Sequence, residues 1–157
     1  QFGLCLQKVN VTRDFGQDFA AGRSYWPLDL LASFGLTPER AAARPDEALG
    51  ALDAMIDAIE GNARGAIAYT LRIPPAEHRL RMFCAVSLLL ALRTLGRIRG
   101  NPDVFAPSGS AHPRGSLKVP RVEMAAMVEA LAAAVEDDAR LAALLSTAQE
   151  AAHPTRR

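Results

Sequence analysis

Apolar residues recur at steps of three and four along most of the 157-residue chain, and runs in which apolar and polar residues alternate are not found. Steps of this kind place apolar side chains on one face of an α-helix. Alanine, leucine and arginine, which favour helices, dominate the composition. The sequence therefore predicts an all-α protein.

The predicted helices are separated by breaks that contain glycine or proline. The first begins at Gln1, with no capping residue ahead of it, and runs to about Phe19. A loop is expected over residues 100–116, with a turn at its start. Further helices are expected over residues 27–35, from 37, over 46–73, 76–98 and 120–135, and around Leu141 to Leu145.

The segment 76–98 carries apolar residues on nearly every side of the expected helix. A helix that is apolar all round is usually buried all round. We therefore expect a central core helix in which Phe83 and Leu90 are inaccessible. On this prediction, Phe83→Ala would carry the cost of a large-to-small core substitution.

The composition indicates a single folded unit, because half of the residues are apolar and 22% are charged. We assign residues 1–152 to one domain and residues 153–157 to a basic tail. The formal net charge of +1 gives no basis for nucleic-acid binding. Cys5 and Cys84 lie in apolar segments without partners at zinc spacing, which predicts reduced core thiols.

No apolar run reaches the roughly 20 residues that a membrane-spanning helix needs, and the N-terminus lacks the pattern of a signal peptide. The expected location is therefore cytoplasmic. A peripheral contact between the basic tail and a membrane is left open.

Four polar residues of the first helix, Gln7, Asn10, Asp14 and Asp18, are spaced by three, four and four residues. At about 100° per residue they fall within an arc of about 80° on one face. Mg²⁺ prefers oxygen ligands and usually joins one or two carboxylates to a substrate's phosphates. The face is therefore suited to a diphosphate that is held through Mg²⁺.

Two arginines lie beside this face. Arg13 is on a neighbouring face of the helix and Arg23 follows in the next loop, where they could bind phosphate oxygens. A pair of aspartates at this spacing is most often a solvated helix face. Here the rest of the helix is largely apolar, and polar groups on a buried helix are costly unless they face a cavity.

The segment from Leu6 to Asp18 reads LQKVNVTRDFGQD and is followed by GRSYWP over residues 22–27. This pattern resembles the second aspartate-rich motif of the squalene/phytoene synthase family, and within it the squalene synthases. The resemblance implies an isoprenoid-synthase helical bundle with a central apolar cavity. The chain would supply the C-terminal half of that bundle.

The same resemblance implies roles for the motif residues. Asn10, Asp14 and Asp18 would bind Mg²⁺, and the two aspartates would act in catalysis together with Gln7. Substrate contacts would come from Asn10, Arg13, Arg23, Tyr25 and Phe83. The family commonly has Glu where this chain has Gln17, so this face carries one acidic group fewer.

Two later segments extend the resemblance. LRMFCAVSLLLA over residues 80–91 is similar to the family helix that lines the prenyl cavity, although plain core packing would give the same pattern. LKVPR over residues 117–121 is similar to the basic stretch near the nicotinamide cofactor of squalene synthases. Lys118 and Arg121 would then bind NADPH, although a solvated helix start is the more common explanation for such cations.

The family also has a first aspartate-rich helix, which precedes the motif described above. This chain has no counterpart of that first helix. Asp53 and Asp57 repeat the spacing without the flanking residues, and we interpret them as a solvated face. We therefore expect the chain to be part of a longer protein or one half of a two-chain assembly.

The resemblance implies Mg²⁺-dependent, head-to-head condensation of two farnesyl diphosphates through presqualene diphosphate, followed by reduction with NADPH. One alternative is phytoene or dehydrosqualene synthesis, which needs no reductant. Another is a non-catalytic relative that serves in assembly or lipid binding. An unrelated helical scaffold is the remaining one.

Overall fold

The computed structural model describes residues 1–107 and 117–152. The predicted basic tail over residues 153–157 and the part of the predicted loop over residues 108–116 lie outside the described residues. Within them the secondary structure is helical and contains no strand, so the all-α prediction is confirmed. The elements are α1 Phe2–Arg13, α2 Phe15–Ala20, α3 Leu28–Ser33, α4 Pro38–Ala43, η1 Pro45–Ala48, α5 Leu49–Arg72, α6 His78–Ile98, η2 Pro102–Phe105, α7 Arg121–Ala132 and α8 Asp138–Ala151.

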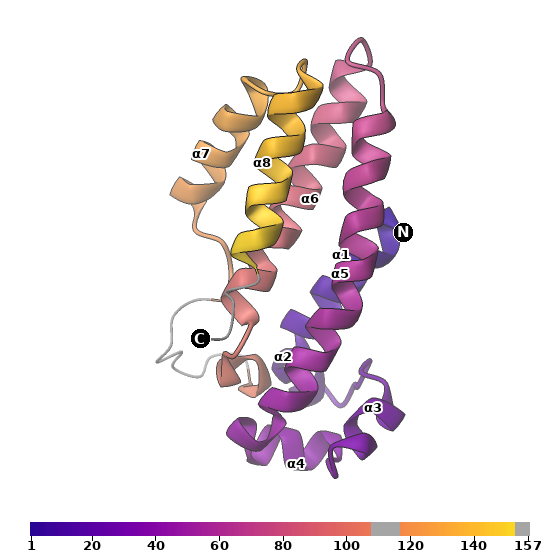
Figure 1. Cartoon of the computed structure of the whole chain (residues 1–157). Helices are drawn as coiled ribbons and strands as arrows, with labels where there is room; N and C mark the ends of the chain where they lie inside the picture. Colours follow the sequence, from indigo (N-terminus) through magenta and orange to yellow (C-terminus); the bar gives the residue numbers. More distant parts are fainter. Residues whose placement is uncertain (108–116, 153–157) are drawn as a thin grey trace.

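The two longest helices, α5 and α6, run side by side, and α1 packs against both of them (Figure 1). Helix α8 contacts both α5 and α6, and α7 contacts α6. The short helices α3 and α4 lie at one end of this bundle, near the start of α5. Helix α1, which carries most of the predicted polar face, therefore packs with one side on the two long helices.

The apolar stripe of α5 forms much of the core, as its spacing predicts. Its members are fully buried from Leu52 through Ile59 to Ala66. The flank of α5 beside this stripe is not simply solvated, because Asp57 and Glu60 pair with Arg99 at 3.2 and 2.7 Å. Arg99 also donates to the carbonyl oxygen of Ala152 at 2.9 Å, so these charges link α5 to the end of α8.

The prediction that α6 is buried all round is wrong. Leu88, Leu92 and Leu95 are buried, but Phe83 is 66% exposed and Leu90 is only partly buried. The apolar residues of α6 outnumber the positions that α1, α5, α7 and α8 cover. Because Phe83 makes few core contacts here, the large cost expected for Phe83→Ala does not apply.

Both cysteines are free and buried, as predicted. Burial raises the pKa of the Cys5 thiol to about 11 and also raises the pKa of Cys84. A thiol with a raised pKa stays protonated at neutral pH and is a poor nucleophile or metal ligand. The cysteines are therefore core residues of this fold.

In the ranges 1–107 and 117–152, none of the helices combines the length and the apolar character needed to cross a membrane.

Candidate active site

A pocket of about 460 Å³ opens at the junction of α1 and α2. All four residues of the predicted polar face line it, and Tyr25 joins them from the loop that follows α2. The pocket is thus built from two helices and one turn that adjoin in sequence. Its lining consists of Gln7, Asn10, Val11, Arg13, Asp14, Asp18 and Tyr25.

The polar face is carried by two helices rather than one, which corrects the prediction of a continuous helix to Phe19. The break falls at Asp14, whose φ and ψ are −93° and 11°. Immediately after it, Gly16 packs so closely on η2 that a Cβ atom would lie 2.0 Å from the carbonyl oxygen of Ala106. Only glycine allows α2 to approach η2 in this way. The direction of α2, and with it the position of Asp18, depends on this contact.

An aromatic cluster fixes the same junction from the other side. The ring of Phe15 lies 5.2 Å from that of Trp26 and 5.0 Å from that of Phe105, both edge to face. Trp26 also donates its indole N–H to the carbonyl oxygen of Val11 at 3.2 Å. This bond attaches the turn that carries Tyr25 to the last turn of α1.

The end of α2 is closed by a glycine in the left-handed region, Gly22, with φ of 73°. The amide of Arg23 donates to the carbonyl oxygen of Asp18, and that of Gly22 to Phe19, both at 2.9 Å. These two bonds form the helix-ending motif that usually has glycine at this position. The turn brings the side chain of Arg23 back to Asp18.

Both pocket carboxylates are paired with arginine. Arg13 makes a two-point contact with Asp14, with N–O distances of 2.7 and 2.6 Å. Arg23 donates to Asp18 at 3.0 Å. The two negative charges are therefore balanced by two guanidinium groups that are themselves suited to phosphate oxygens.

A second, smaller pocket of about 180 Å³ adjoins the first and lies between α1 and α6. It shares Asn10 and Arg13 with the polar pocket, and its other lining residues are mostly apolar. These are Leu6, Val9, Ser87, Leu90, Ala91 and Thr94. A polar head group in the first pocket would thus have an apolar surface next to it.

The structure does not bring every predicted site residue together. Phe83 is exposed on α6 and lines neither of these pockets. Lys118 precedes α7 and Arg121 is its first residue; both side chains are exposed, and neither lines the pocket of Asp14. Arg23 is not among the lining residues but reaches the site through Asp18.

The residues that position the site were missed by sequence reasoning. Gly16, Trp26 and Phe105 do not line the pocket of Asp14, yet together they hold the junction of α1 and α2. Two signals were available: Trp26 stands in the quoted family motif, and a glycine in the middle of a helical pattern, such as Gly16, often marks a close approach of another segment.

The oxygen atoms of this pocket would hold a metal cation only together with a bound phosphate ligand. No group of three or more His, Cys, Asp or Glu side chains that could hold a metal occurs in the part of the chain that the structure describes. Asp14, Asp18 and the amide oxygen of Asn10 offer hard oxygen ligands on one pocket wall. Mg²⁺ is commonly bound by such a partial set, completed by substrate phosphates and water.

The family model for squalene/phytoene synthases matches residues 1–123, which is most of the chain. The match includes α1, α2, α5 and α6 and therefore the whole of the Asp14 pocket. An all-α fold with a carboxylate-lined pocket agrees with this match. The chain belongs to the squalene/phytoene synthase family.

Among curated relatives, squalene synthase of Schizosaccharomyces pombe is 34% identical over 110 residues, which cover 66% of this chain and 22% of that protein. Squalene synthase of Dictyostelium discoideum is 30% identical over 133 residues, or 83% of this chain and 30% of that protein. Squalene synthase of Eremothecium gossypii is 32% identical over 113 residues, with 68% and 24% covered. The chain thus spans less than a third of the length of these relatives.

Proposed function

We propose that this chain forms the diphosphate-binding wall of a squalene synthase-like prenyltransferase. The reaction would be the head-to-head condensation of two farnesyl diphosphates to presqualene diphosphate, followed by reduction with NADPH. The observation that carries the proposal is the single pocket into which Gln7, Asn10, Asp14 and Asp18 converge. The opposite wall would come from another part of the protein or from a second chain.

In this proposal the chain's own residues bind and orient the leaving diphosphate. Asp14, Asp18 and Asn10 would hold Mg²⁺, which when bound supplies Lewis-acid stabilisation of the departing diphosphate. Gln7 and Tyr25, which line the same pocket, would lie beside the start of the prenyl chain. The adjoining apolar pocket between α1 and α6 would hold the start of the chain and exclude water from it.

The two arginines would change partners when substrate binds. In the free protein Arg13 neutralises Asp14 and Arg23 neutralises Asp18. A diphosphate offers each guanidinium a more highly charged partner, and the carboxylates would then be free for the cation. In this proposal the two ion pairs balance the charges of Asp14 and Asp18 until the substrate and the cation bind.

This exchange predicts that Arg13→Gln weakens binding of Mg²⁺-pyrophosphate about tenfold, the expected loss of one charged hydrogen-bonding group. Isothermal titration calorimetry with inorganic pyrophosphate measures the effect. Arg72→Gln is the matched control, because Arg72 is exposed at the end of α5 and away from the pocket. Equal dissociation constants for Arg13→Gln and Arg72→Gln would contradict a role of Arg13 in phosphate binding.

The reductive step rests on Lys118 and Arg121, which we propose bind a phosphate of NADPH. In the complete enzyme, the double variant Lys118→Ala with Arg121→Ala is expected to form presqualene diphosphate at the normal rate and to accumulate it. Product analysis at several NADPH concentrations checks this. If the double variant reduces the intermediate normally, NADPH does not depend on these two residues.

The main alternative is phytoene or dehydrosqualene synthesis, which shares the first condensation and needs no hydride donor. The family description covers both squalene and phytoene synthases, whereas the relatives named above are squalene synthases. The similarity to these relatives favours squalene. A non-catalytic assembly or lipid-binding relative would not need two carboxylates converging with an amide in one pocket.

A further inference from the structure

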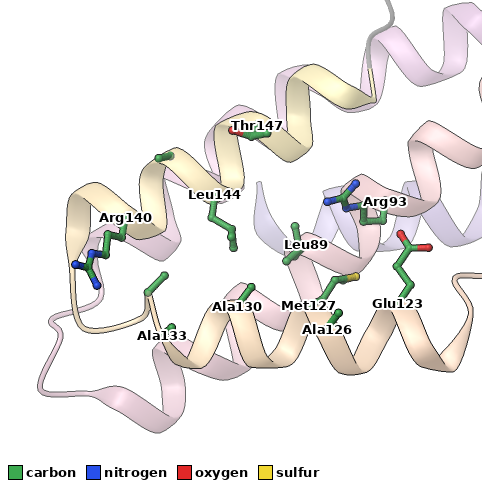
Figure 2. A pocket seen from close by; sticks show the side chains of 12 residues that line it. Leu89, Arg93, Glu123, Ala126, Met127, Ala130, Ala133, Arg140, Leu144 and Thr147 are labelled. Carbon is green, nitrogen blue, oxygen red and sulfur yellow. The ribbon is translucent and has the colours of Figure 1, made fainter.

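A cavity larger than the pocket of Asp14 lies away from it, on the side of the protein formed by α7 and α8. It is a groove of about 600 Å³ between α7 and α8, with α6 as its floor (Figure 2). It shares no residue with the pocket of Asp14. Its lining consists of Leu89, Arg93, Glu123, Ala126, Met127, Ala130, Ala133, Ala134, Arg140, Ala143, Leu144 and Thr147. Most of these residues lie beyond residue 123, where the family match ends.

The groove exists because α7 and α8 each pack on α6 and face one another with small side chains. Met127 and Leu131 of α7, and Leu141 and Leu145 of α8, are buried. Alanines line the space between the two helices, and their methyl groups are too short to meet across it. The result is an apolar channel that runs along about three turns of α7, or roughly 16 Å.

The two ends of the groove differ in charge. At one end Arg93 lies near Glu123, as Figure 2 shows, and Glu123 is already paired with Arg97. Two arginines and one glutamate leave this end with a net positive charge. At the other end lies Arg140, which contacts Asp137 at 3.6 Å and is close in sequence to the exposed Glu136.

We propose that this groove binds one long-chain carboxylate of the fatty-acid type. The hydrocarbon chain would lie along the alanine walls, and the carboxylate would pair with Arg93. A guanidinium group matches a carboxylate with two parallel hydrogen bonds. Because Glu123 is paired with Arg97, Arg93 leaves this end of the groove with one positive charge, which suits a head group with one negative charge, whereas a diphosphate would leave charge unpaired. At the other end Asp137 offsets the charge of Arg140, so the methyl end of the ligand would lie there.

The proposal is tested by titrating dodecanoate, below its micelle concentration, into the protein in a calorimeter. Saturable binding with one site per chain is expected. Ala130→Phe fills the groove and should weaken binding at least about tenfold. Ala125→Phe places the same ring on an exposed position of α7 that does not line the groove, and should leave the dissociation constant unchanged. Circular dichroism of both variants checks that the helices are intact.

A second experiment tests whether Arg93 binds the carboxylate. Arg93→Gln should weaken dodecanoate about five- to tenfold, the loss expected for one charged hydrogen-bonding group, and leave the uncharged analogue dodecanol unchanged. The proposal is overturned if dodecanoate does not bind saturably or if Ala130→Phe binds it as well as Ala125→Phe does. It is also overturned if farnesyl diphosphate displaces dodecanoate with comparable affinity, because the groove would then not select a single negative charge.

Discussion

Replacing Asp14 with Asn in the complete enzyme should lower turnover about a hundredfold or more, because about 3 kcal/mol of transition-state stabilisation is removed. The substitution preserves the size of the side chain but removes the charge that would hold Mg²⁺ against the leaving diphosphate. Since that charge matters most as the diphosphate departs, kcat should fall more than the affinity for the prenyl chain. Steady-state kinetics with farnesyl diphosphate at saturating Mg²⁺ measures both.

The matched control for this experiment is Asp29→Asn. Asp29 is an exposed aspartate on α3 that does not line the pocket, so its substitution should leave kcat unchanged. Near-normal Mg²⁺-dependent turnover by Asp14→Asn would show that this carboxylate does not hold the cation. A rise in KM without a fall in kcat would assign Asp14 to substrate binding alone.

The second large effect is on stability. Gly16→Ala should lower the free energy of unfolding by about 3 kcal/mol or more, because the added methyl group cannot share the space of the Ala106 carbonyl. Backbone must move to accommodate it, and the aromatic contact between Phe15 and Phe105 would loosen with it. Urea unfolding followed by circular dichroism measures the change.

Gly3→Ala provides the comparison, since it makes the same substitution within the first helix. A Cβ atom there would meet nothing within 4 Å, so alanine should be neutral or stabilise the helix by up to about 1 kcal/mol. The destabilised Gly16→Ala protein should also bind Mg²⁺-pyrophosphate more weakly, because α2 carries Asp18. If both alanine variants unfold at the same urea concentration, the close contact between α2 and η2 is not present in solution.

The candidate site was largely predictable from the sequence because its residues come from adjoining segments. The spacing of Gln7, Asn10, Asp14 and Asp18 is a property of one helical face, and the break at Asp14 shifts that face without dispersing it. The loop residue Tyr25 could be added only through the family motif. The helical spacing thus predicted which residues line the pocket, and the resemblance supplied the roles proposed for them.

Features that depend on distant segments were not predictable in this way. The break at Asp14 follows from the contact between Gly16 and η2, and nothing near Gly16 in the sequence announces that partner. The exposure of Phe83 has the same origin, because an apolar pattern shows which side chains could be buried but not how many neighbours are present. The groove between α7 and α8 likewise arises from how two helices diverge on α6.

Calorimetry with farnesyl thiodiphosphate, an analogue with a slow leaving group, measures whether Asp14 and Asp18 bind a prenyl diphosphate through Mg²⁺. Binding should require Mg²⁺ and should be lost when EDTA is added or when Asp14 and Asp18 are both replaced by Asn, while Asp29→Asn should bind normally. Binding of equal strength with Mg²⁺ and with EDTA, or unchanged binding by the double variant, would contradict this role of the two aspartates.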